Sequence, residues 1–249
     1  MTSLFFIELY CFLDVNGQFL HACETGNLDE VLRILYYHDN GPTKLLQVDP
    51  DSLNHMHYLH AACFHGHHEV VEQLFVFGLD VNLNSRHGTP LSVASQGGHL
   101  ETVKVLVKHH ADIYDPMLPE TLSPIFQACK HGHLEVFNYL ISAKPEAVSE
   151  LGPRLLVQAC CDGFLGIVIV LLSNNVDVNG SLVSMSPSHA CVSFDSLLEC
   201  PLHAALSQGH VEVAEYLLQE GAEVTLDLVE NFYEEIGEAV SGYVVLYEY

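Results

Sequence analysis

The sequence predicts an all-α protein, a solenoid of about six repeats that each contribute two short helices and a β-hairpin finger. A glycine recurs with a period near 33 residues, and an alanine always stands four residues before it. A large apolar residue stands seven positions before each glycine, and an apolar pair follows eight and nine positions after it. The six glycines are Gly26, Gly66, Gly98, Gly132, Gly163 and Gly209. Chance does not produce one pattern at six registers, so we interpret it as a structural repeat.

Each segment of the repeat has a physical reason. The alanine lies on the first helix, where neighbouring helices must approach closely, and the glycine opens the tight turn that follows. An acidic residue three positions after the glycine suits the positive end of the second helix. It occurs as Glu69, Glu101, Glu135 and Glu212. The second helix is expected to end at a residue suited to the left-handed conformation. The candidates for that position are Gly78, His110, Asn175 and Gly221.

The repeats divide the chain into three parts. We expect an N-terminal extension at 1–13, a repeat domain at 14–226, and an acidic tail or capping helix at 227–249. The six repeats are placed at about 14–50, 51–84, 85–118, 119–150, 151–196 and 197–226. Longer linkers, within 38–54 and 180–199, interrupt the period, and surface loops tolerate such insertions.

Two segments carry a family resemblance. "TPLSVASQGGHLETVKVLVKHHAD" (89–112) and "CPLHAALSQGHVEVAEYLLQEGAE" (200–223) resemble ankyrin repeats, whose signature is T-P-L-H-x-A followed by G-H. The resemblance implies that His60 and His203 bond to the hairpin backbone. It also implies that the histidines after the turn glycines link adjacent repeats. These are His67, His99, His133 and His210. Repeat five lacks both histidines, and repeat one keeps only the apolar skeleton and its glycine.

The resemblance also implies a function, which is recognition of a protein partner on the concave side without catalysis. The contact positions are hairpin tips and the exposed ends of the first helices. On this chain they are Glu24, Thr25, Met56, Phe64, His65, Arg86, Gln96, Lys130, His131, Cys161, Asp162, Ser207 and Gln208. Phe64 is an aromatic residue at a position that is usually wet, so it is a candidate anchor. The alternative is that Phe64 folds against the neighbouring hairpin.

A narrower resemblance concerns the second half of the chain. "PRLLVQACCDGFLGIV" followed by a long insertion and "CPLHAALSQGHVEVAEYLL" is similar to the N-terminal ankyrin segment of Roco-group leucine-rich-repeat kinases. It covers about 100 residues. This resemblance implies, as an alternative, a regulatory segment of a multidomain kinase.

Composition excludes several classes of partner. Eight basic residues face 32 acidic ones, giving a formal net charge of −24. Such a surface repels phosphate backbones and anionic lipid, so we expect neither nucleic acid nor membrane as a partner. The apolar start of the chain lacks a basic n-region, which argues against a cleaved signal. We expect a monomer in the cytoplasm, with the nucleus left open.

A histidine-rich stretch raises a rival hypothesis. "HMHYLHAACFHGHHE" (55–69) holds six histidines and a cysteine, and imidazole and thiolate are zinc ligands. Three of these histidines occupy repeat positions, which leaves a metal-binding or redox-sensing module on His55, His57, Cys63 and His68 as the alternative. Nucleotide-binding and hydrolase motifs are absent from the sequence. We therefore expect no catalytic residue and no cofactor.

Three further features qualify the prediction. By resemblance, Asn82 and Asn179 in "DVN" match positions that an asparaginyl hydroxylase can modify in ankyrin proteins. Ile169 stands at an outer position that is polar in other repeats, so we expect another segment or domain to cover it. Cys161 could be a modifiable thiol, although an ordinary surface cysteine is the simpler interpretation.

Overall fold

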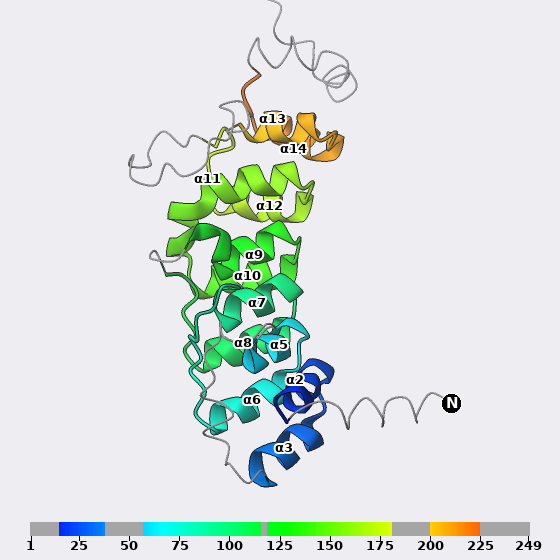
Figure 1. Ribbon diagram of the computed structural model, residues 1–249. Helices are drawn as coiled ribbons and strands as arrows, with labels where there is room; N and C mark the ends of the chain where they lie inside the picture. Colours follow the sequence, from blue (N-terminus) through cyan, green and yellow to red (C-terminus); the bar gives the residue numbers. More distant parts are fainter. Residues whose placement is uncertain (1–14, 38–56, 116–118, 181–199, 225–249) are drawn as a thin grey trace, which may run out of the picture. The chain divides into compact units, whose positions relative to one another are not determined.

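The computed structural model describes residues 15–37, 57–115, 119–180 and 200–224. The chain divides into two compact units, unit 1 (Met1–Val136) and unit 2 (Phe137–Tyr249), and the boundary falls inside helix α10. In the described ranges the α-helices form six consecutive pairs (Figure 1). The pairs are α2 (Val15–Thr25) with α3 (Leu28–Tyr37), α5 (Tyr58–Phe64) with α6 (His68–Val76), α7 (Pro90–Gly97) with α8 (Leu100–Lys108), α9 (Pro124–Lys130) with α10 (Leu134–Ala143), α11 (Glu146–Cys161) with α12 (Leu165–Ser173), and α13 (Pro201–Ser207) with α14 (Val211–Gln219). The predicted all-α solenoid is confirmed.

The core of unit 1 consists of the residues that define the repeat. Helix α2 packs on α5, α5 on α7, and α7 on α9. The apolar residue seven positions before each glycine and the alanine four before it are fully buried in all four repeats of this unit. These residues are Phe19, Leu59, Leu91, Ile125, Ala22, Ala62, Ala94 and Ala128. Extra methylenes at the alanines would overpack the helix contacts, at a cost of about 1–3 kcal/mol.

Unit 2 keeps the same core but has a longer first helix. Leu156, Ala159 and Ala205 are buried in the contact between α11 and α13. Helix α11 has 16 residues, contains Pro153, and begins ahead of the repeat boundary expected after residue 150. Gly152 permits a close approach in this helix, because a Cβ there would lie 2.7 Å from Cγ2 of Val176.

The turns follow the predicted backbone conformations. The six repeat glycines have φ between 68° and 79°, in the left-handed region where a side chain is strained. His110 (φ 65°) and Asn175 (φ 60°) are the two non-glycine residues with positive φ in the described ranges. Both end the second helices α8 and α12, as the sequence predicts.

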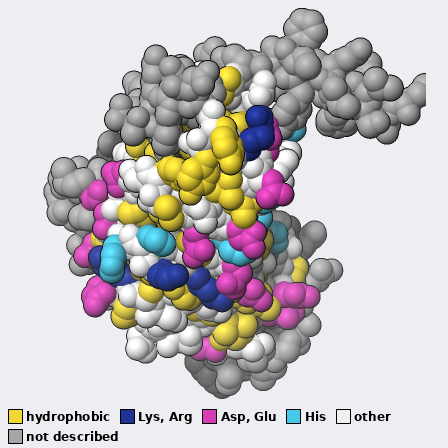
Figure 2. All heavy atoms as spheres, turned by 90° about the horizontal axis from the view of Figure 1, so that it is seen from below, with side chains coloured by type: hydrophobic (Ala, Val, Ile, Leu, Met, Phe, Trp, Pro, Cys, Tyr) yellow, Lys and Arg dark blue, Asp and Glu magenta, His cyan; other side chains and the backbone are white. Residues whose placement is uncertain are grey.

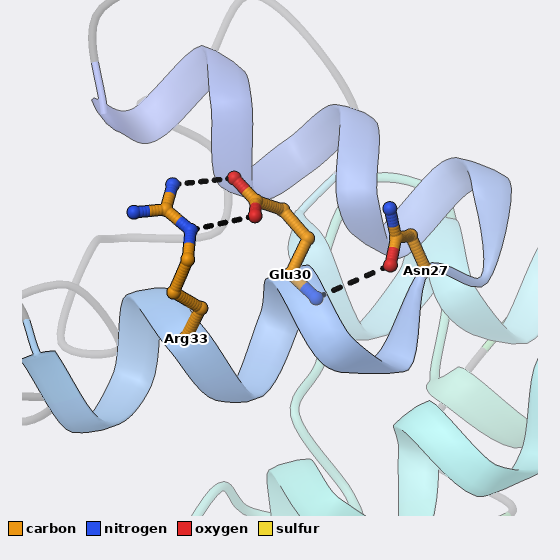
Figure 3. Close-up of polar contacts among 3 residues, drawn as sticks. All are labelled: Asn27, Glu30 and Arg33. Carbon is orange, nitrogen blue, oxygen red and sulfur yellow. Dashed lines mark hydrogen bonds and ion pairs between the residues drawn. The ribbon is translucent and has the colours of Figure 1, made fainter.

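Side chains cap the helix starts. Asn27 Oδ1 accepts a hydrogen bond from Glu30 N at 3.2 Å at the beginning of α3, and Arg33 forms a two-contact ion pair with Glu30 at 2.5 and 2.6 Å (Figure 3). Hydrogen bonding to the Arg33 guanidinium lowers the pKa of Glu30. The predicted acidic residues lie in the first turns of α6, α8, α10 and α14, where they complement the helix dipole.

The hairpin fingers are short. In the described part they contain one antiparallel bridge, between Ser85 and Gly88, closed by backbone bonds of 2.8 and 3.1 Å. His60 is a buried residue of α5, and its Nε2 donates a hydrogen bond to Gly88 O at 3.0 Å. This bond confirms the one expected of the T-P-L-H histidine. The 38–54 linker, almost all of the 180–199 linker and the 227–249 tail lie outside the described residues.

Helix α12 is apolar on all sides, and its outer position is open in the described structure. Ile169 is 41% exposed, so no described residue provides the cover that we expected for it. Part of that expectation concerned the 180–199 linker, of which 181–199 lie outside the described residues.

Candidate partner-binding stripe

Histidine links hold the backbone of the predicted contact positions. In unit 1, His67 Nε2 donates to Glu24 O (2.8 Å) and His99 Nε2 to Phe64 O (2.8 Å). His133 Nε2 donates likewise to Gln96 O at 2.9 Å. Because a carbonyl can only accept, each of these rings carries its proton on Nε2. The links expected from the family are therefore confirmed.

Unit 2 repeats this device once. His210 Nε2 donates to Cys161 O at 3.0 Å. A Cβ on Gly163 would lie 2.6 Å from the His210 ring, so the glycine is required by space as well as by its φ of 76°. Phe164 occupies the linking position of repeat five and has no ring nitrogen with which to form such a bond.

We call the first-helix ends of unit 1 the binding stripe. It comprises Glu24, Thr25, Phe64, His65, Gln96, Gly97, Lys130 and His131. Four of these residues are exposed, namely Thr25, His65, Lys130 and His131, and the others are half-buried. The linked carbonyls belong to Glu24, Phe64 and Gln96, so the next repeat fixes the stripe backbone at these three residues through an atom that is not part of the side chain.

Two histidine pairs build the same local structure on the stripe. In each H-G-H tripeptide the exposed ring stacks on the linked ring. His65 lies 6.2 Å from His67 at 24°, and His131 lies 6.3 Å from His133 at 23°. Phe64 contacts the His65 ring edge to face at 5.3 Å. This aromatic contact orients Phe64 beside His65 on the stripe.

The other predicted contact positions are dispersed. Arg86 is exposed at the hairpin tip and its Nε donates to His87 Nε2 at 3.1 Å. In unit 2, Cys161 and Asp162 are half-buried, whereas Ser207 and Gln208 are exposed. Met56 lies outside the described residues.

The residues of the metal hypothesis are not brought together in the described part of the chain, where no group of three potential ligands converges. Burial raises the pKa of the Cys63 thiol far above its ordinary value, so this residue is a protonated core thiol. His57 is also buried and caps α5, with Nδ1 accepting from Leu59 N at 3.3 Å. His55 lies outside the described residues.

The asparagines of the two "DVN" segments have a structural role. Asn82 Oδ1 accepts from Asp112 N at 2.9 Å, and Asn179 Oδ1 accepts from Glu223 N at 2.9 Å. Each bond therefore joins the finger of one repeat to that of the next. A hydroxyl added at Cβ would leave this amide oxygen in place.

Sequence reasoning missed an aromatic cluster at the C-terminal end of α3. Tyr36 and Tyr37 are exposed, Tyr37 by 82%, and the Tyr36 ring lies 5.2 Å from Phe77. Val76, which directly precedes Phe77 in the sequence, is exposed at the end of α6. Figure 2, a view from below Figure 1, shows hydrophobic side chains gathered beside charged and histidine side chains. The signal in the sequence was the aromatic pair directly after the buried Ile34 and Leu35.

Six two-helix units with left-handed glycine turns, four of which carry a linking histidine, define a solenoid repeat protein. The family model "Ankyrin repeats (3 copies)" matches residues 19–117 and 125–227, so the chain belongs to the ankyrin-repeat family. Ankyrin repeats are protein–protein interaction domains. No helix in the described ranges is long and apolar enough to span a membrane.

Known proteins show the same relationship. The crystal structure of the human ASB11 ankyrin repeat domain superimposes with a TM-score of 0.65 and 27% identity, covering 83% of this chain and 85% of that one. The probable E3 ubiquitin-protein ligase XBOS32 of Oryza sativa is 28% identical over 70% of this chain. The mouse leucine-rich repeat serine/threonine-protein kinase 1 is 30% identical over 54% of it. The chain spans 32% of the first relative and 6% of the second.

Proposed function

We propose that the chain is a non-catalytic recognition module, a scaffold or adaptor that docks a protein partner on the binding stripe. The observation that carries this proposal is the set of histidine links, because in three of the four stripe repeats they fix the backbone, at Glu24, Phe64 and Gln96, before any partner arrives. A preorganised surface loses less conformational entropy on binding. Phe64 supplies an aromatic anchor of the kind found at interaction hot spots.

The proposal is tested by affinity capture from a cell extract, with the wild-type chain compared to Phe64→Ala and His131→Ala. Phe77→Ala and His109→Ala are matched controls, since both residues lie on second-helix ends away from the stripe. Proteins retained by the wild type and the controls should be depleted at least about tenfold by the stripe variants. Retention of the same proteins by all five chains would refute the proposal. Circular dichroism establishes that each variant is folded.

A second candidate is the regulatory ankyrin segment of a Roco-type kinase, supported by the 30% identity to the mouse kinase. The full transcript decides it, because leucine-rich repeat, GTPase and kinase sequence must follow Tyr249 if the candidate is right. A cytoplasmic location and a monomeric state also belong to the proposal. Imaging of the tagged chain and analytical ultracentrifugation test them.

Hydroxylation of Asn82 and Asn179 is proposed from the family resemblance. Their side chains cross between fingers of adjacent repeats, and both asparagines are half-buried. Peptide mass spectrometry of protein from its native cells should show a gain of about 16 Da on these residues. Unmodified peptides throughout would remove the proposal.

A further inference from the structure

The binding stripe differs in charge from the rest of the chain. The chain has 32 acidic and 8 basic residues, yet Glu24 is the single acid among the eight stripe residues. Three of the four exposed positions carry a lysine or an imidazole, namely His65, Lys130 and His131. The equivalent positions of unit 2 carry no basic residue. The basic character is therefore local to unit 1.

Lys130 differs from the cations on the second helices. Arg33, Lys104 and Lys108 each lie within 4 Å of a carboxylate, with contacts of 2.5, 2.7 and 3.6 Å. Lys130 forms no ion pair with any described residue, although it is exposed. Among the described residues, Arg33, Lys104 and Lys108 are thus paired with acids, whereas the ammonium group of Lys130 on the stripe is not.

The other residues of the stripe add shape and polarity. The rings of His65 and His131 rest on linked histidines, so their positions are defined. In the repeat between those of His65 and His131, the equivalent position is Gly97. A side chain does not fit there, because a Cβ would lie 2.6 Å from Phe64 O. Phe64 provides an apolar contact next to His65.

We propose that the binding stripe selects an acidic protein segment with at least one apolar side chain. The carboxylates of that segment would meet Lys130, His131 and His65, and its apolar side chain would contact Phe64. This inference rests on the proposed function and names the partner class for the same site. Charge complementarity of this kind chiefly determines specificity and the rate of association. The net charge of −24 opposes acidic ligands at long range, so the attraction operates within the Debye length of about 8 Å at physiological salt.

The test selects ligands from a displayed library of random twelve-residue peptides, on the whole chain at 0.15 M salt. Peptides that bind the wild type are sequenced and their affinities measured by fluorescence anisotropy. The charge variant is Lys130→Glu with His131→Glu. The chain offers a matched control, because Lys108 and His109 form the same dipeptide at the end of α8. The control variant Lys108→Glu with His109→Glu makes the same change in net charge away from the stripe.

We expect acidic peptides to dominate the selected set. Their affinity should fall at least about tenfold in the charge variant, equivalent to about 1.4 kcal/mol, and by less than about twofold in the control. Selection of neutral or basic peptides, or equal losses in the two variants, would overturn the inference. If such peptides still require Phe64, as measured with Phe64→Ala, the stripe remains a recognition surface and only its acid preference fails. If no selected peptide responds to Phe64→Ala or to the charge variant, the proposed function fails as well.

Discussion

Protonation of His57 should destabilise unit 1 as the pH falls. The His57 side chain is 1% exposed, and its Nδ1 accepts the capping hydrogen bond from Leu59 N. The proton of the neutral ring is therefore on Nε2, a buried atom with no hydrogen-bond partner among the described residues. Burial, with a smaller contribution from His60, lowers the pKa of His57 from 6.5 to about 4.

The sign of the effect follows from proton linkage. Below about pH 6.5 the unfolded chain binds a proton at this histidine, and the folded chain does not until about pH 4. The stabilising contribution is thus fully present above pH 6.5 and is lost progressively as the pH falls toward 4. For these two pKa values, the loss between pH 7.5 and pH 5 is about 2 kcal/mol.

The assay is urea unfolding followed by circular dichroism at 222 nm at both pH values, on the wild type and His57→Thr. Threonine is the matched replacement, because Thr89 occupies the same register and caps α7 by accepting from Ser92 N at 3.2 Å. The free energy of unfolding should fall by about 2 kcal/mol more in the wild type than in the variant. His87→Thr is the control, since an exposed ring meets water in both states. Parallel losses in the wild type and His57→Thr would refute the reasoning.

Four further predictions use other parts of the chain. Gly209→Ala should lower the free energy of unfolding by about 1–2 kcal/mol, because an alanine is strained in the left-handed backbone conformation. No steric cost is added, because a Cβ there meets nothing within 4 Å. Gly163→Ala should cost at least about 1 kcal/mol more in the same urea titration, because it also displaces the linking histidine. Asn82→Ala should lower the unfolding free energy by about 1 kcal/mol through loss of one inter-repeat hydrogen bond. Burial raises the pKa of the Cys161 thiol, so peptide mapping after iodoacetamide treatment at pH 7.5 should show Cys161 reacting more slowly than free cysteine. Cys160 is fully buried and should react only in urea.

Much of the fold was predictable because each repeat encodes its structure locally. A left-handed turn needs a residue such as glycine whatever surrounds it, and the conformations of His110 and Asn175 followed from their place in the period. The histidine links were predictable from the family resemblance alone. Their geometry joins atoms more than 30 residues apart in sequence, as in the bond from His99 to Phe64.

The rest depended on side-chain geometry and packing that the repeat pattern does not show. His57 was a candidate metal ligand because it does not occupy one of the histidine positions of the repeat. Its role as a helix cap emerges only from the distance between its ring nitrogen and Leu59 N. The early start of α11 was hidden by Pro153, which is a helix breaker by propensity. The burial of Gly152 against Val176 favours a continuous helix there, and such packing overrides propensity.

The histidine links also explain why the side chains at the first-helix ends can differ between repeats while the fold stays the same. The link uses the backbone carbonyl of the residue two positions before each glycine, and it makes no demand on the side chain there. Among the repeats with a link, that side chain is a carboxylate, an aromatic ring, an amide or a thiol, at Glu24, Phe64, Gln96 and Cys161. A substitution at such a half-exposed position can change the chemistry offered to a partner without breaking the bond between repeats. The stability of the solenoid and the specificity of its surface are therefore separable at these four residues, because one depends on a backbone oxygen and the other on the side chain attached beside it.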